Sequence, residues 1–140
     1  MIIFSIAYFF LLCYIEIMGI GIDIIEIDRI KKIVCRNKFL ISTVFSEDEI
    51  EQLINKQDIY SSIAGRFCAK EAFFKCLGTG IESLNMLKLI RILNDKNGKP
   101  EIYLNGILLE KYKNFEFHVS ISHCKSYACA VVSSKKSYFS

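Results

Sequence analysis

Apolar and polar residues recur with two different periods along this chain of 140 residues. Residues 16–25 form an apolar run that predicts a buried strand, in which Gly19 and Gly21 allow close backbone approach. From residue 26 to about residue 38 the apolar positions follow a helical period, which predicts an amphipathic helix. The chain therefore begins its folded part with a strand that leads directly into a helix.

Capping residues predict two further helices in the central part of the chain. Ser46 and Glu49 have the spacing of a capping box, which indicates the start of a short helix. A long helix through Leu77 follows, and Ser61 or Ser62 can cap its first turn.

Alternation of apolar and polar residues predicts strands in the second half. The strands expected are 87–93, 101–104, 116–122 and 127–133, with a short helix at 105–113. The turn-rich stretch 94–100 is typical of a hairpin connection. Together these elements predict a compact α+β single domain with one mostly antiparallel sheet and a long helix.

Composition narrows the class of protein. A length of 140 residues and a hydrophobic fraction of 52% fit one domain with one core. A net charge of +3 is too small to indicate nucleic acid, and we expect no nucleic-acid partner. The six cysteines show no paired short spacing, which favours buried free thiols in a reducing compartment.

The N-terminal stretch 2–15 is almost continuously apolar but shorter than the roughly 20 residues that a membrane span needs. We interpret residues 1–13 as an apolar extension or targeting leader, 14–136 as the domain, and 137–140 as a polar tail. We expect no stable membrane insertion of the mature domain. A leader on a chain rich in Ile, Lys, Phe and Asn indicates a plastid-like organelle, with the cytoplasm as the alternative.

A carboxylate among three cations marks the long helix. Glu71 lies within one helical stretch with Arg66, Lys70 and Lys75. One explanation is an ordinary ion pair between Glu71 and Lys75, which are four residues apart. The other is a site for phosphate and metal, since one carboxylate does not require three cations.

Asp23 is a carboxylate inside the first apolar strand, where burial is costly unless it is paired or binds a cation. Capping of the following helix is the competing explanation. Mg²⁺ typically takes one or two carboxylates and completes its shell with water and phosphate oxygens. Asp23 and Glu71 match that demand. The turn of Gly78, Thr79 and Gly80 allows close approach of a ligand, or simply ends the helix.

His118 lies on the polar face of an alternating strand. It is either a hydrogen-bonded structural residue or a base, since histidine titrates near neutral pH. Ser120 and Ser122 share its strand face, but no nucleophile elbow surrounds either serine. His123 lies in an expected turn and is the weaker candidate.

Basic residues form a stripe on the helix at 26–38. Arg29, Lys32 and Arg36 recur at helical spacing on one face. Such a stripe is either a solvated helix face or a docking surface for an acidic partner, where it would speed encounter more than it adds affinity.

Three sequence blocks together resemble the holo-[acyl-carrier-protein] synthase family, the small 4'-phosphopantetheinyl transferases. The first is Gly21-Ile22-Asp23, and the second runs from Arg66 through Lys70, Glu71 and Lys75 to Gly80. The third comprises His118, Ser120, Tyr127 and Ala128, and the turn 97–100 also agrees with the family.

The resemblance implies the phosphopantetheinyl transferase fold and a homotrimer with coenzyme A bound between subunits. It implies Mg²⁺-dependent transfer of the phosphopantetheine arm to a serine of acyl carrier protein, with release of adenosine 3',5'-bisphosphate, in support of fatty acid biosynthesis. The implied metal ligands are Asp23 and Glu71; the catalytic residues are His118, Glu71 and Lys75; the coenzyme A contacts are Arg66, Lys70, Lys75, Gly78, Thr79 and Gly80; and the carrier contacts are Arg29, Lys32 and Arg36. The alternative is a non-catalytic module that binds an acidic protein through helix 26–38.

Overall fold

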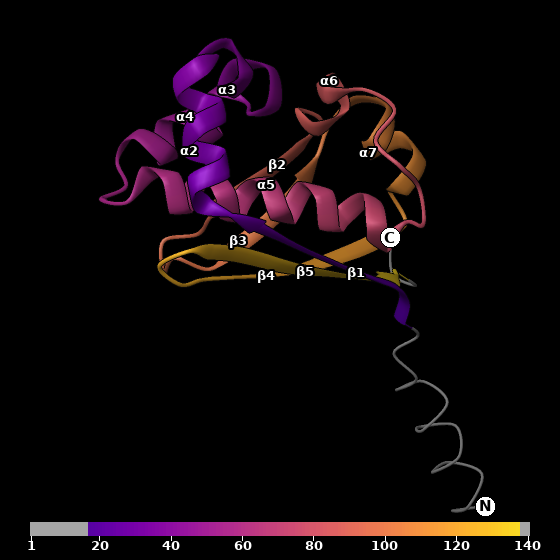
Figure 1. Cartoon of the computed structure of the whole chain (residues 1–140). Helices are drawn as coiled ribbons and strands as arrows, with labels where there is room; N and C mark the ends of the chain where they lie inside the picture. Colours follow the sequence, from indigo (N-terminus) through magenta and orange to yellow (C-terminus); the bar gives the residue numbers. More distant parts are fainter. Residues whose placement is uncertain (1–16, 138–140) are drawn as a thin grey trace, which may run out of the picture.

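The computed structural model describes residues 17–137, and its helices and strands follow one another in mixed order (Figure 1). The strands are β1 (Ile17–Glu26), β2 (Ile90–Asn94), β3 (Pro100–Leu104), β4 (Phe115–His123) and β5 (Tyr127–Lys136). The helices are α2 (Ile27–Arg36), α3 (Phe39–Val44), α4 (Glu47–Ile54), α5 (Ile59–Cys76), α6 (Leu84–Leu87) and α7 (Gly106–Tyr112). This confirms the α+β class.

The strands form two antiparallel sheets rather than the single sheet expected from the sequence. One has three strands in the order β1-β5-β4, and the other is the hairpin of β2 and β3. In the larger sheet Asp23 pairs with Ala130, which pairs with Ile121, so these three side chains share one face. The predicted hairpin around 94–100 is confirmed, but it forms a sheet of its own that is not hydrogen-bonded to the other three strands.

Helix α5 lies across one face of the three-stranded sheet (Figure 1). Twelve of its eighteen residues are buried, as expected for a helix that is surrounded by protein rather than amphipathic. Gly19 and Gly21 bring β1 close to it: a Cβ on Gly19 would lie 2.2 Å from the Cys76 carbonyl oxygen, and one on Gly21 only 1.9 Å from that of Ala72. The predicted close approach at these glycines is confirmed.

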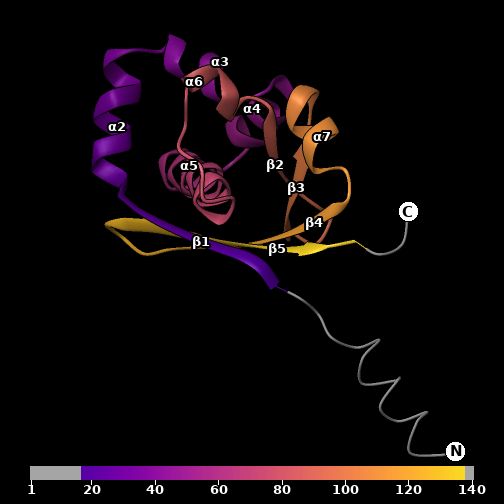
Figure 2. The same cartoon turned by 90° about the vertical axis from the view of Figure 1, so that its right-hand side faces the viewer.

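All the labelled helices lie on the same side of the three-stranded sheet (Figure 2). The opposite face, as the described residues present it, is apolar along β1 and continues onto β5. Ile20, Ile22 and Ile24 are each more than 60% exposed, and Val131 is also exposed. A contiguous apolar face of this kind indicates an interaction surface.

Local chemistry explains where the elements differ from expectation. Helix α5 is capped by Asp58, whose carboxylate accepts from the Ser61 backbone N–H at 3.1 Å, and not by Ser61 or Ser62. Leu87 ends helix α6, so the strand expected from residue 87 begins only at Ile90. Helix α3 was not predicted, because its six residues are too short to show a helical period.

Two predicted signals are confirmed. Ser46 and Glu49 form the capping box of α4. Gly78 ends α5 with a φ of 69°, the left-handed conformation that glycine adopts without strain. The leader at 1–13 and most of the tail at 137–140 lie outside the described residues. Within residues 17–137 no helix is long and apolar enough to cross a membrane.

Candidate active site

Helix α5 presents its charged residues in two different directions. Glu71 and Lys75 face β1 and solvent, whereas Arg66 and Lys70 point into the protein on another side of the helix. The sequence expectation placed all four around one site. The structure brings only Glu71 and Lys75 together with Asp23.

Lys75 forms its ion pair with Asp23 on the neighbouring strand. The Lys75 Nζ donates to Asp23 Oδ1 at 2.8 Å, with the lysine side chain 53% exposed and the aspartate 17% exposed. This bond to Asp23 raises the pKa of Lys75. Among the described residues no ion pair joins Lys75 to Glu71. The N-cap residue of α2 is Glu26, so Asp23 does not cap this helix. The two simpler explanations, an ion pair for Glu71 and a helix cap for Asp23, are therefore wrong.

Glu71 and Asp23 are close enough to interact electrostatically. Burial raises the pKa of Glu71, the negative charge of Asp23 raises it further, and Lys75 partly offsets both. Burial and the same two carboxylates also raise the pKa of Cys68. Two carboxylates in repulsion are stabilised by a cation placed between them.

The donor set fits Mg²⁺. The described residues contain no cluster of three or more His, Cys, Asp or Glu side chains, so the protein offers two carboxylates here. Mg²⁺ is typically held by one or two carboxylates together with waters and substrate phosphates. Asp23 and Glu71 are the residues that would hold it.

An apolar pocket of about 440 Å³ opens beside these carboxylates. It is lined by Asp23 and Glu71, by Arg29 of α2, and by aliphatic and aromatic side chains from β1, α2, α3, α5 and α6. Mixed lining of this kind, apolar walls with a few polar groups, is typical of small-molecule sites. The pocket joins the carboxylate pair to the basic helix.

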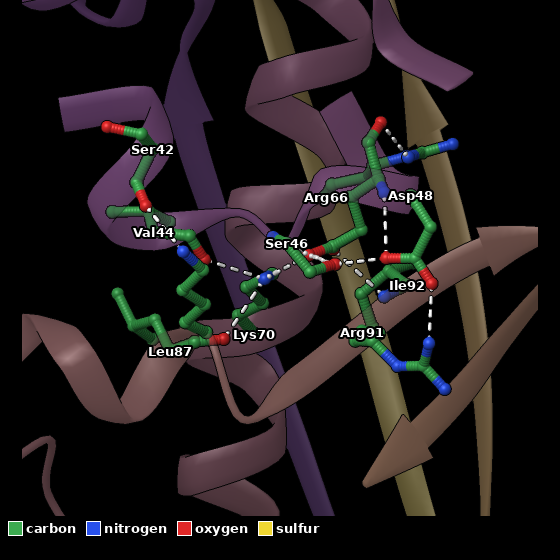
Figure 3. Close-up of polar contacts among 11 residues, drawn as sticks. Ser42, Val44, Ser46, Asp48, Arg66, Lys70, Leu87, Arg91 and Ile92 are labelled. Atoms are coloured by element: carbon green, nitrogen blue, oxygen red, sulfur yellow. Dashed lines mark hydrogen bonds and ion pairs between the residues drawn. The ribbon is translucent and has the colours of Figure 1, made fainter. Parts of the chain in front are cut away.

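Lys70 does not reach this pocket. Its side chain is fully buried, and its ammonium group donates to Glu49 Oε2 at 2.8 Å and to the carbonyl oxygens of Val44 at 2.8 Å and Leu87 at 3.0 Å (Figure 3). Burial lowers the pKa of Lys70 to about 8, although the Glu49 carboxylate opposes the shift. With all three N–H groups used internally, Lys70 has no donor for a phosphate, which corrects the expected coenzyme A contact.

Arg66 is likewise turned inward, with only 3% of its surface exposed. Its guanidinium donates to the Glu49 carbonyl oxygen at 3.0 Å, to Gln52 Oε1 at 2.7 Å and to Asn94 Oδ1 at 2.9 Å. Burial lowers the pKa of Arg66. These bonds tie α5 to α4 and β2, so the structure assigns Arg66 a role inside the fold rather than at the carboxylate pair.

The turn of Gly78, Thr79 and Gly80 is exposed directly after Lys75 and the end of α5. A Cβ built on Gly78 or Gly80 would meet no atom within 4 Å. The turn thus leaves open space for a ligand near Lys75, and its contact with coenzyme A stays a prediction.

His118 lies on the other face of the three-stranded sheet from Asp23. Its cross-strand neighbour is Ser133, whereas Asp23 shares the α5 face with Ala130. The His118 side chain is 60% exposed, and its Nε2 lies 4.0 Å from Glu116. Within one chain, the sheet separates this base from the carboxylate pair.

A second pocket, of about 550 Å³, lies where the edges of β3 and β4 meet. His118 lines it together with charged and aromatic residues that include Arg91, Lys99, Tyr103 and Lys113. The described part of one chain therefore carries the base in one pocket and the carboxylates in another.

The basic stripe on α2 is solvent-facing as expected. Arg29, Lys32 and Arg36 are all exposed, and Arg29 also lines the apolar pocket. The stripe thus continues to the mouth of the carboxylate site.

Sequence reasoning missed two features. Glu49 was recognised only as part of a capping box, because its second carboxylate oxygen accepts from the distant Ile92 N–H, a contact invisible in sequence. The bond between Asp23 and Lys75 joins residues 52 positions apart. A signal for the first existed: a lysine within the apolar helical stretch needs a buried partner.

Comparison with known proteins finds relatives that share most of this chain and its fold. A holo-[acyl-carrier-protein] synthase of Clostridium tetani is 48% identical over 117 residues, covering 81% of this chain and 92% of the relative. A crystal structure of such a synthase from Bacillus anthracis, in complex with CoA (3',5'-ADP), matches with a TM-score of 0.73 and 36% identity over 86% of this chain and 98% of that one. The coenzyme A complex of the Helicobacter pylori synthase matches with a TM-score of 0.69 and 38% identity over 81% and 96%.

The family model that matches is the 4'-phosphopantetheinyl transferase superfamily, over residues 19–132. This range runs from the first glycine of β1 into β5 and includes Asp23, Glu71, Lys75 and His118. The chain is therefore a member of the 4'-phosphopantetheinyl transferase superfamily.

Proposed function

We propose that this protein transfers the 4'-phosphopantetheine arm of coenzyme A to a serine of apo-acyl carrier protein and releases adenosine 3',5'-bisphosphate. The observation that carries the proposal is the grouping of Asp23, Glu71 and Lys75 at the mouth of an apolar pocket. The relatives named holo-[acyl-carrier-protein] synthase, and the coenzyme A bound in two of their structures, support it.

In this reaction the serine oxygen forms a bond to the phosphorus of the arm as the P–O bond of the pyrophosphate breaks. Asp23 and Glu71 would hold Mg²⁺, which supplies positive charge for the pyrophosphate when bound. Lys75, exposed and one helical turn from Glu71, is placed to contact phosphate oxygens. In phosphoryl transfer a protein contributes mainly by positioning reactants and stabilising charge.

The serine proton requires a base, and we assign that role to His118, acting directly or through water. Since His118 lies across the sheet from Asp23, a second copy of the chain would supply it. The exposed face of Ile20, Ile22, Ile24 and Val131 is a surface on which such a copy can pack. We therefore propose a homotrimer that binds coenzyme A between neighbouring subunits.

The carrier protein would dock on α2. Arg29, Lys32 and Arg36 are exposed, and Arg29 reaches the pocket beside the carboxylates. Carrier proteins of this type are acidic, so the charges are complementary. The holo-carrier would support fatty acid biosynthesis. The proposed place of action is a plastid-like organelle reached through residues 1–13, with the cytoplasm as the alternative.

One experiment tests the proposal. Purified protein is mixed with apo-acyl carrier protein, coenzyme A and Mg²⁺, and the carrier is weighed by mass spectrometry. We expect a mass gain of one phosphopantetheine group, which disappears when a chelator removes the metal. A non-catalytic module that binds an acidic partner through helix 26–38 would produce no mass gain, whether or not the chelator is present.

A further inference from the structure

A buried polar network lies on the side of α5 that faces away from the sheet. We call Glu49, Lys70 and Arg66 the Glu49 network, after the residue that links the other two. Glu49 and Lys70 have no exposed surface, and Arg66 has 3%. None of these residues lines the carboxylate pocket. The proposed reaction therefore makes no direct use of them.

Lys70 is held from three directions. Its Nζ donates to Glu49 on α4, to the carbonyl oxygen of Val44 at the end of α3, and to that of Leu87 at the end of α6 (Figure 3). An ammonium group has three N–H donors, so every donor is used. This lysine anchors α5 to three separate helices.

Glu49 is fixed just as fully. Its Oε2 accepts from Lys70 at 2.8 Å and from the Ser46 N–H at 2.9 Å, and its Oε1 accepts from the Ile92 N–H of β2 at 2.9 Å. Arg66, one turn before Lys70, donates to the Glu49 carbonyl oxygen at 3.0 Å. Two anchors one helical turn apart restrain both the rotation and the sliding of α5.

The opposite side of α5 packs on the sheet, where Phe73 contacts Phe117 of β4 and small residues give the closest approach. Gly19 and Gly21 of β1 pack against the backbone of Cys76 and Ala72. Two hydrogen bonds also cross from α5 to the sheet, from Lys75 to Asp23 and from the Cys68 thiol to the Ala128 carbonyl oxygen, but the lysine is solvent-exposed and a thiol is a weak donor. The Glu49 network therefore supplies the buried charged hydrogen bonds that fix the orientation of α5 about its axis.

Glu71 directly follows Lys70 in the chain, so rotation of α5 moves Glu71 relative to Asp23. Helical side chains extend roughly 5–6 Å from the axis, and a rotation of about 10° displaces them by about 1 Å. A misplacement of that size can cost about 10²-fold in rate.

We propose that Glu49 and Lys70 are positioning residues for the reaction: they hold α5 in the orientation that places Glu71 opposite Asp23. This rests on the proposed function for its kinetic consequence, but its effect on metal binding is independent of the substrates. A purely stabilising role is the competing explanation. Stability alone does not require charges here, because replacing a buried ion pair by well-packed apolar residues is often neutral or stabilising.

The test is the double variant Glu49→Leu/Lys70→Met, which removes both charges and retains similar side-chain volumes. It is measured for melting temperature, for Mn²⁺ binding by electron paramagnetic resonance without substrates, and for kcat and KM. We expect a folded protein whose kcat falls about 10²-fold and whose Mn²⁺ affinity falls about tenfold. The KM for the carrier should not change, because α2 is untouched.

Ile92→Val is the control, since it trims the fully buried core next to Glu49 yet keeps the backbone N–H that Glu49 accepts from. It should lower the melting temperature without changing Mn²⁺ affinity or kcat. Wild-type kcat and Mn²⁺ affinity in the double variant would overturn the proposal. So would a loss in Ile92→Val equal to that in the double variant.

If the double variant does not fold, Glu49→Gln carries the test with the same two readouts. Reduced kcat and Mn²⁺ affinity support the positioning role, and wild-type values overturn it. Failure of the proposed function gives a different result. The wild-type protein would then produce no mass gain on the apo-carrier, whereas its Mn²⁺ affinity would still change in the variants.

Discussion

Lys70 and Lys75 lie five residues apart on the same helix, yet they have opposite environments. Lys70 is fully buried and has three internal acceptors, whereas Lys75 is 53% exposed and has one, Asp23. The carboxylates near these two lysines, Glu49 and Glu71, differ in the same way. Glu49 is buried with four hydrogen bonds, while Glu71 is half-buried beside another negative charge.

This contrast shows how to distinguish charges that stabilise the fold from charges that are available to a ligand. A buried ionic group whose hydrogen-bonding capacity is satisfied inside the protein belongs to the fold. A pair of repelling carboxylates next to an exposed lysine and a pocket leaves charged groups accessible to a cation or an anionic ligand. The two groups of charged residues differ mainly in whether their hydrogen-bond donors and acceptors are satisfied inside the protein, and less in charge or in position along the sequence.

The largest effect is expected at the repelling carboxylates. Asp23→Ala and Glu71→Ala should each abolish transfer while leaving the melting temperature nearly unchanged. Removing either carboxylate relieves repulsion, and the ion pair of Asp23 with the solvent-exposed Lys75 contributes about 1 kcal/mol or less. The measurement is mass gain on the apo-carrier together with thermal unfolding.

Asp23→Asn and Glu71→Gln serve as controls of matched size for these variants. They should be equally inactive, because neutral amides are poor substitutes for the carboxylates that Mg²⁺ prefers. Full restoration of the Glu71→Ala rate by excess Mg²⁺ would contradict direct ligation by that carboxylate.

How far the sequence anticipates this contrast depends on how local each signal is. The capping box of Ser46 and Glu49 and the helix stop at Gly78 involve residues within one turn, and both are confirmed. The Asp23 and Glu71 pair was anticipated because a lone carboxylate in an apolar strand is costly. The inward direction of Lys70 was not, because it depends on carbonyl oxygens 26 and 17 positions away.

The placement of His118 illustrates the same limit. Alternation along β4 correctly predicted that it lies on the polar face opposite Phe117 and Val119. Which face of the sheet α5 covers is decided by packing between distant segments, so no local signal indicates that Asp23 and His118 face opposite ways. The division into two sheets was not predicted either, because the signals of a hairpin do not show whether its strands also pair with strands elsewhere in the chain.

His118→Ala should depress kcat by roughly 10²–10⁴-fold, the usual contribution of general acid–base catalysis, with little change in coenzyme A binding. Its exposed side chain makes a small contribution to stability, so the melting temperature should stay close to that of wild type. The diagnostic is the pH–rate profile: the acid limb that a histidine base produces should vanish in the variant. An unchanged profile would return His118 to a structural role.

A mixture experiment sharpens the assignment across subunits. Asp23→Ala chains, which should be inactive, and His118→Ala chains, which should be roughly 10²–10⁴-fold slower, are unfolded together, refolded together and assayed. If one subunit supplies His118 to the carboxylates of another, some mixed sites contain both wild-type residues, and activity should return. No recovery from properly refolded mixtures would contradict a shared site.

The buried side of the comparison predicts loss of stability in the single variant Glu49→Ala. It leaves the Lys70 ammonium buried without its carboxylate, which should lower the free energy of unfolding by about 3–5 kcal/mol. Urea unfolding measures it, with Glu71→Ala as the matched control from the ligand-facing side. Similar unfolding curves for the two variants would remove the distinction between the two groups of charges.

The smallest effect is expected on the basic stripe, whose charges are exposed like Lys75 and, in the proposed function, contact the carrier protein. Arg29→Glu and Arg36→Glu should each raise the KM for the carrier about tenfold, corresponding to about 1.4 kcal/mol, and leave the KM for coenzyme A nearly unchanged. Lys96→Glu, an exposed change in the turn between β2 and β3, is the control for altered net charge. Added salt should weaken the wild-type interaction and narrow the difference between wild type and variants, because exposed charges are screened over about 10 Å at 0.1 M ionic strength. Equal loss for both substrates would place these arginines at the nucleotide instead, and indifference to salt would exclude an electrostatic docking surface.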